Sequence, residues 1–160
     1  MYPDPRSGHL SQFNVMLGDR ALAAARSMGP ASSDVNLWTG EKLIDTPRKD
    51  GLDWPEELGA YAKTEGRALV RLPIRFLRIN SMLIWSAPVE MFCEIAMDVR
   101  NRSPFDHTFY FGYTNGWFGY LPTAKGFEEG GYEPRTSPFT AQVEADVREQ
   151  VIAFIAGLPR

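Results

Sequence analysis

The spacing of hydrophobic residues predicts helices near both ends of the chain. Residues 11–28 carry apolar side chains three and four positions apart, with Ser11 placed to cap a helix and Gly29 and Pro30 placed to end it. The same spacing recurs over residues 138–158, where the charged side chains lie away from the apolar face. Both segments are therefore expected to be helices that pack on one side.

The middle of the chain predicts a β-hairpin. Residues 68–79 and 82–87 are strand-like runs separated by Asn80 and Ser81, which form an acceptable hairpin turn. Pro73 has no backbone N–H to donate to a ladder, so we expect it at a sheet edge or a bulge.

The segment before the hairpin, residues 30–66, mixes turn-forming residues with short apolar runs. This mixture predicts a long surface excursion that holds one short strand and a short helix after Pro55.

After the hairpin, the pattern predicts a helix and another strand. The helix runs from Pro88 to about Asn101, which places Glu90 in its first turn, and the strand covers residues 105–113. This order indicates an α/β fold with a mixed sheet and helices packed on it, in a single domain over residues 1–160. Because ligands of open parallel α/β sheets bind at the carboxyl ends of strands, we expect the site in the loop that follows.

Composition narrows the class of protein. The chain has 160 residues, of which 44% are apolar and 23% charged, and its net charge is −3, as in a soluble domain without a cationic surface for nucleic acid. No apolar run reaches the roughly 20 residues that span a bilayer, and the first ten residues, MYPDPRSGHL, lack the features of a signal peptide. The single cysteine, Cys93, stands among apolar residues and is expected to be a buried thiol.

Three turn-rich segments contribute the candidate chemistry: SAPVE (residues 86–90), FGYTNGWFGYLPT (111–123) and GGYEP (130–134). Their polar candidates are Glu90, Tyr120 and Tyr132. Taken singly, each has a structural interpretation, as a carboxylate favoured by a helix dipole or as half-buried loop anchors.

The common catalytic signatures are missing. The sequence has no HExxH, paired CxxC, GxSxG, P-loop or GxGxxG pattern. The two histidines, His9 and His107, do not by themselves predict a metal site.

Taken together and in order, the three segments resemble the neutral ceramidase family. Its catalytic domain has a P-G-E segment after a hydrophobic strand, then a helix, a strand, an N-x-Y-x-x-Y-x-T loop and an R-Y-E segment. The resemblance is strongest over residues 67–134, and the twelve-residue spacing from Tyr120 to Tyr132 agrees with the family's. The chain departs from the pattern at three positions: Val89, where the family has glycine, Trp117, where the loop usually has its first tyrosine, and Gly131, where the family usually has arginine.

The resemblance implies a zinc-dependent amidase that hydrolyses the N-acyl bond of ceramide-type lipids. Glu90 and Tyr120 then take the positions of two zinc ligands, and Tyr132 takes that of the tyrosine beside the reacting carbonyl. In the aromatic loop, residues 111–123, the candidate substrate contacts are Asn115, Trp117 and Phe118. The aromatic side chains of Trp85, Trp117 and Phe118 fit a wall for a lipid chain and an ordinary core equally well.

The family's two zinc histidines and its catalytic serine belong to upstream segments with no counterpart here. Two protein ligands are too few for a catalytic zinc, which normally has three and a water. We therefore expect a partial catalytic domain, completed by a missing N-terminal segment or by a separate chain, or else a degenerate relative. The resemblance favours an extracellular or periplasmic location.

Two other classes of function stay open. One is a non-catalytic module that binds a lipid, a glycan or a protein through the aromatic loop. The other is an interaction subunit that forms homo-oligomers through exposed strand edges.

Overall fold

The computed structural model describes residues 5–159, so the first four residues of the N-terminal segment interpreted above lie outside the described residues. The chain divides into two compact units, Met1–Asp34 and Val35–Arg160. Helix α1 (Pro5–Ser27) makes up most of the first. The predicted helix is confirmed, but it begins before Ser11, which is therefore not its cap.

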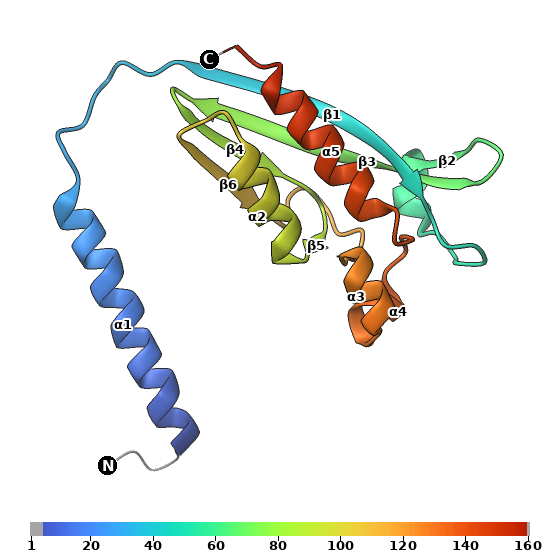
Figure 1. Cartoon of the computed structure of the whole chain (residues 1–160), viewed down its shortest axis with the longest axis horizontal. Helices are drawn as coiled ribbons and strands as arrows, with labels where there is room; N and C mark the ends of the chain where they lie inside the picture. Colours follow the sequence, from blue (N-terminus) through green and yellow to red (C-terminus); the bar gives the residue numbers. More distant parts are fainter. Residues whose placement is uncertain (1–4, 160) are drawn as a thin grey trace. The chain divides into compact units, whose positions relative to one another are not determined.

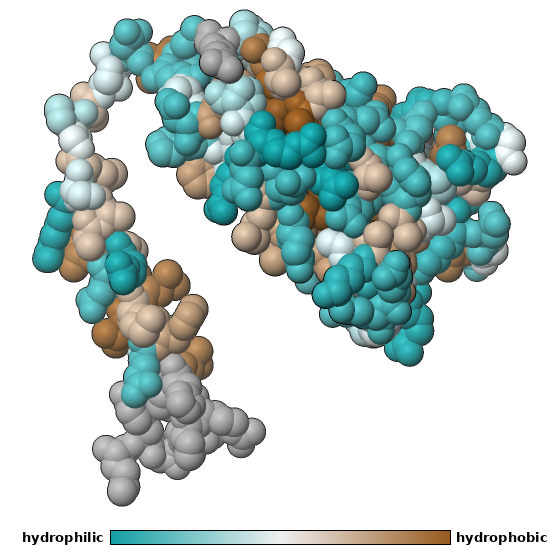
Figure 2. Space-filling model, viewed as in Figure 1, coloured by the Kyte–Doolittle hydropathy of each residue, from teal (hydrophilic) through white to brown (hydrophobic). Residues whose placement is uncertain are grey.

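Apolar side chains of α1 are exposed from Leu10 onward, and they appear in brown along the helix in Figure 2. The predicted one-sided packing is thus not formed within this unit. The side chain of His9 lies outside the described residues.

The second unit is built on a five-stranded mixed sheet (Figure 1). Its strands are β1 (Leu37–Pro47), β2 (Ala62–Thr64), β3 (Ala68–Ile79), β4 (Met82–Ser86) and β6 (His107–Phe111). The order is β1-β3-β4-β6, with β2 also paired to β3. The pairs with β3 are antiparallel, and β6 runs parallel to β4. The predicted class, an α/β fold with a mixed sheet and packed helices, is confirmed in this unit.

Strand β1 corrects the prediction for residues 30–66. It is eleven residues long and pairs with β3 from Leu37 opposite Ile79 to Pro47 opposite Leu69. The apolar β3 offers a full ladder, and pairing along it outweighs the turn formers in the local sequence. The surface excursion is therefore shorter than predicted, and its helical part is the 3-10 helix η1 (Glu56–Tyr61).

Strands β3 and β4 form the predicted hairpin, with Asn80 in the left-handed backbone region at φ 53°. Pro73 lies opposite Leu43 of β1. On its other side, β3 pairs with β2 at residues 68–70 and with β4 at residues 75–79, which leaves Pro73 between the two. The expected edge position is confirmed locally, because among the described strands only β1 pairs with β3 there.

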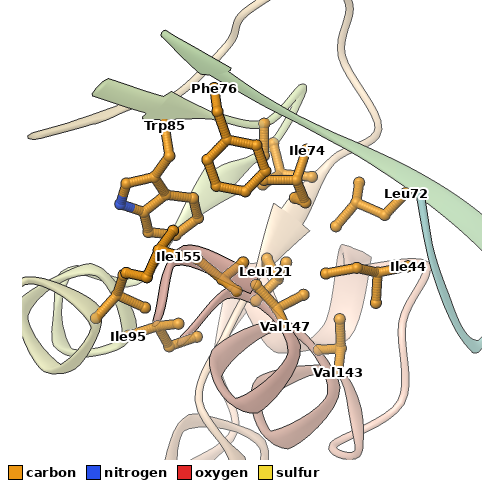
Figure 3. Packing of buried hydrophobic residues seen from close by; sticks show 14 of the residues in the cluster. Ile44, Leu72, Ile74, Phe76, Trp85, Ile95, Leu121, Val143, Val147 and Ile155 are labelled. Atoms are coloured by element: carbon orange, nitrogen blue, oxygen red, sulfur yellow. The ribbon is translucent and has the colours of Figure 1, made fainter. Parts of the chain in front are cut away.

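Helices α2 (Cys93–Arg102) and α5 (Val143–Ala156) cover one face of this sheet (Figure 1). Helix α5 buries every fourth residue, starting at Val143, later than the predicted start at residue 138. Its side chains meet those of the strands in the core that Figure 3 shows. The residues of the five-stranded sheet labelled there are Ile44, Leu72, Ile74, Phe76 and Trp85.

The start of α2 corrects a second prediction. Glu90 lies outside the helix, in the short strand β5 (Glu90–Met91), which pairs in parallel with β7 (Tyr120–Leu121). The N–H groups of Glu90 and Phe92 donate to the carbonyls of Gly119 and Leu121 at 3.1 and 3.0 Å, which keeps this segment extended. The partners in this ladder are far away in the sequence, so the local spacing of apolar residues could not predict it.

Cys93 is exposed at the first position of α2, so the prediction of a buried thiol is wrong. The helix buries Ile95 and Val99 instead. Because α2 begins only after β5, the face it turns to the core differs from the one that the apolar spacing indicates.

Candidate functional site

The structure brings the three predicted polar residues together. Glu90 and Tyr120 are cross-strand neighbours in the β5–β7 pair. Tyr132 is the first residue of α4 (Tyr132–Thr136), which is separated from β7 by α3 (Ala124–Glu129). The rings of Tyr120 and Tyr132 meet edge to face, with centroids 5.8 Å apart and planes at 77°.

A fourth polar residue, Tyr113, was not predicted. Its hydroxyl donates a hydrogen bond to Oε2 of Glu90. Its ring stacks on Trp117 with centroids 5.0 Å apart and planes at 7°, and Trp117 meets Tyr120 edge to face at 5.5 Å. Glu90, Tyr113, Trp117, Tyr120 and Tyr132 therefore form one connected group, called the aromatic cluster below.

Backbone hydrogen bonds fasten the aromatic loop to residues 87–89. The N–H groups of Tyr113, Thr114 and Phe118 donate to carbonyls in that segment at 3.2, 3.3 and 2.6 Å. Gly119, just before β7, has φ +98°, and a Cβ added there would lie 3.0 Å from Cδ of Pro138. A side chain at this position would be strained in its backbone and crowded by the proline. Hydrogen bonds and the packing at Gly119 therefore hold the backbone of the loop that carries the cluster.

The cluster raises the pKa of two of its phenols. The hydrogen bond to Glu90, followed by desolvation, raises the pKa of Tyr113 to about 12. Desolvation, followed by the negative charge of Glu90, raises the pKa of Tyr120. Both phenols are therefore protonated at neutral pH, and that of Tyr113 donates its hydrogen bond to Glu90. A cation beside them would oppose this effect.

Replacing Glu90 with alanine should lower the pKa of Tyr113 from about 12 toward the ordinary 10.0. Because the folded-state pKa is raised, the associated stability is full below pH 10.0 and is lost as pH rises through about 12. Between pH 10.0 and about 12, the Glu90→Ala variant should therefore lose less folding stability than the wild-type protein. NMR titration of ring-labelled tyrosine measures the pKa, with Glu94→Gln as a control that removes an exposed carboxylate four residues further along the chain. An unchanged pKa of Tyr113 in Glu90→Ala would show that the hydrogen bond does not form.

The remaining predicted residues fall into two environments. Trp85 and Phe118 are buried in the core, where Phe118 meets Tyr61 at 5.0 Å. Asn115 is exposed in a left-handed turn at φ 60°, and Trp117 is 45% exposed. Three aromatic residues were assigned either to a wall for a lipid chain or to the core. Trp85 and Phe118 are core residues, and Trp117 lies at the surface.

The donors present fit only part of a zinc site. Within residues 5–159, no three His, Cys, Asp or Glu side chains that the structure describes gather closely enough to hold a metal ion. In the aromatic cluster, Glu90 is the one residue of these four types, and the other oxygen donors are phenols, whereas a catalytic zinc normally has three ligands of these types. His107 is exposed at the start of β6, and the aromatic loop follows the other end of that strand. The residues that the structure describes therefore do not gather three His, Cys, Asp or Glu ligands around one position.

Comparison with known proteins gives matches among solved structures alone, since no family model and no curated protein matches the chain. Neutral ceramidase from Pseudomonas aeruginosa aligns with 78% of this chain, at a TM-score of 0.53 and 16% identity. The chain has a ceramidase-like fold. A ceramidase complexed with C2 aligns with 57% of this chain and 16% of its own, at a TM-score of 0.47 and 22% identity.

The ceramidase-like fold confirms, at the level of architecture, the resemblance seen in the three turn-rich segments. The alignment covers 29% of the Pseudomonas ceramidase, so this chain spans less than a third of that protein's length. Among the described residues, no helix is both long and apolar enough to cross a membrane.

Proposed function

We propose that this chain is part of a zinc-dependent, ceramidase-like amidohydrolase that cleaves the N-acyl amide bond of ceramide-type lipids. The observation that carries the proposal is the meeting of Glu90, Tyr120 and Tyr132 in one cluster on a ceramidase-like fold. Three separate segments supply these residues, and they are the segments on which the family resemblance rests. In line with that resemblance, the enzyme would act outside the cytoplasm.

Glu90 and Tyr120 are proposed as two of the zinc ligands, with the others supplied from outside this chain. A carboxylate oxygen is an ordinary zinc ligand, and the shared β5–β7 ladder keeps the two residues side by side. Tyr113 acts as a positioning residue, because its hydrogen bond orients the Glu90 carboxylate.

Tyr132 is proposed as the catalytic residue that donates to the developing oxyanion. A hydroxyl aimed at the position where negative charge develops stabilises the transition state more than the ground state. Tyr132 is 57% exposed, so a bound amide can reach it, and its ring contact with Tyr120 keeps it beside the proposed ligands.

The test uses the full-length native protein. In Glu90→Ala and Tyr120→Phe, zinc affinity should fall by at least the 10–100-fold that loss of an outer-shell partner costs, and fatty-acid release from ceramide should fall with it. Zinc content is measured by elemental analysis after dialysis against a graded chelator. Glu94→Gln is the matched control and should keep both properties. Full zinc content and full hydrolysis in both variants would overturn the assignment.

An alternative function is a non-catalytic module that binds a lipid or glycan, and the exposed stack of Tyr113 on Trp117 favours it. This alternative predicts that Trp117→Ala abolishes ligand capture in the presence of chelator. A tryptophan fluorescence titration with short-chain ceramide, with and without chelator, separates the two functions.

A further inference from the structure

A small pocket opens beside the aromatic cluster. Its volume is about 240 Å³, and its lining comes from residues 52–55, Leu58, residues 117–119, Thr136 and Pro138. Apart from Asp53 and Thr136, these residues are apolar or glycine. Trp117 belongs both to this lining and to the cluster, so the pocket lies next to the proposed site.

Trp54 forms a fixed wall of the pocket. Its indole N–H donates to the carbonyl of Leu58 at 2.7 Å, and its ring meets Phe118 edge to face at 5.8 Å. The guanidinium of Arg48 lies 5.4 Å from the ring centroid. Since the polar atom of the indole is satisfied by the chain itself, the indole offers its apolar surface to a ligand, and the wall is already formed.

The size of the pocket restricts what it can hold. Pockets that enclose a whole drug-sized ligand measure roughly 300–1,000 Å³, so this one accommodates only part of a lipid. The lining has one charged residue, Asp53, and the Arg48 guanidinium beside Trp54 opposes its charge, so neither an anion nor a cation is favoured as the occupant. An uncharged alkyl segment meets both conditions.

We propose that this pocket binds the first methylenes of the acyl chain of an amide whose carbonyl lies at Tyr132, and that Trp54 and Leu52 determine chain-length specificity. The inference rests on the proposed function, because the amide at the aromatic cluster directs the chain past Trp117. Burial of the acyl chain in the pocket then helps to hold the amide group in place at the aromatic cluster.

The experiment measures binding of butanamide, hexanamide, octanamide and decanamide to the full-length protein by ligand-observed NMR, below the concentration at which any of them aggregates. Each added methylene should raise affinity about fourfold, which corresponds to about 0.8 kcal/mol, until the pocket is full, after which affinity should level off. Leu52→Arg places a charged side chain in the pocket lining and should abolish the dependence on chain length.

Leu43→Arg is the matched control, because Leu43 is 43% exposed, Leu52 is 40% exposed, and Leu43 lies outside the pocket on β1. It should keep the wild-type dependence. Trp54→Leu is a second variant that keeps an apolar wall of smaller area, and it should reduce the increment per methylene. Circular dichroism confirms that each variant is folded.

The inference and the proposed function fail in different ways. An unchanged dependence on chain length in Leu52→Arg would overturn the acyl pocket, even if zinc binding and hydrolysis behave as proposed. A dependence that Leu52→Arg abolishes, in a protein without zinc affinity or amidase activity, would support the alkyl pocket and overturn the hydrolase.

Discussion

Replacing Tyr132 with phenylalanine in the full-length protein is expected to lower kcat for ceramide hydrolysis by about 10²–10³-fold, the usual cost of losing one oxyanion donor. The substitution removes a single hydroxyl and keeps the ring that meets Tyr120 at 5.8 Å. KM should therefore change little, because the lost interaction forms mainly in the transition state. Steady-state release of fatty acid from ceramide measures both parameters.

Tyr61→Phe is the matched control for this result. It removes the same hydroxyl from a tyrosine whose ring packs on Phe118, outside the aromatic cluster. This variant should turn over at the wild-type rate. If Tyr132→Phe also does so, Tyr132 has no catalytic role, and its contact with Tyr120 serves the fold alone.

Replacing Trp85 with alanine should reduce the free energy of unfolding by about 3–5 kcal/mol, the usual cost of truncating a buried large aromatic side chain. Trp85 is fully buried on β4, and its ring lies 4.6 Å from that of Tyr110. Because domains are stable by only about 5–15 kcal/mol, a large part of the total would be lost. The midpoint of urea unfolding measures the change.

The comparison variant is Trp117→Ala, which truncates a tryptophan of the aromatic loop that is 45% exposed. Its cost should be roughly 0.5–1.5 kcal/mol, the contribution of an aromatic pair, because the ring stacks on Tyr113. Equal losses in the two variants would mean that burial of Trp85 in the core that Figure 3 shows adds no stability beyond that of an exposed tryptophan.

Elements held together by local interactions could be predicted from the sequence. The hairpin around Asn80 and the apolar face of α5 follow from residues close in the chain. Strand β1 could not be predicted, because its length comes from pairing with β3 over residues 69–79. Glu90 was misassigned to a helix for the same reason, since its partner Tyr120 lies thirty residues away.

The candidate site was predictable where a family motif marked it. Glu90, Tyr120 and Tyr132 stand in such segments, and the structure brings them together. Tyr113 was missed because its contact with Glu90 depends on a left-handed backbone at φ 55°, which is uncommon for a bulky residue. Its one local signal was a place in the same aromatic loop, four residues before Trp117.

Because β5 pairs in parallel with β7, the tip of the aromatic loop can change in length while Glu90 and Tyr120 stay paired. Glu90 and Tyr120 face each other through backbone register, which does not depend on how many residues join β6 to β7. Insertions between Asn115 and Gly116, beyond the hydrogen bonds of Thr114, would change the surface offered to a ligand and preserve the pair. A slip of one residue in the register would instead bring Leu121 beside Glu90. New specificities can therefore be grafted at the loop tip, and the ladder marks the limit of safe redesign.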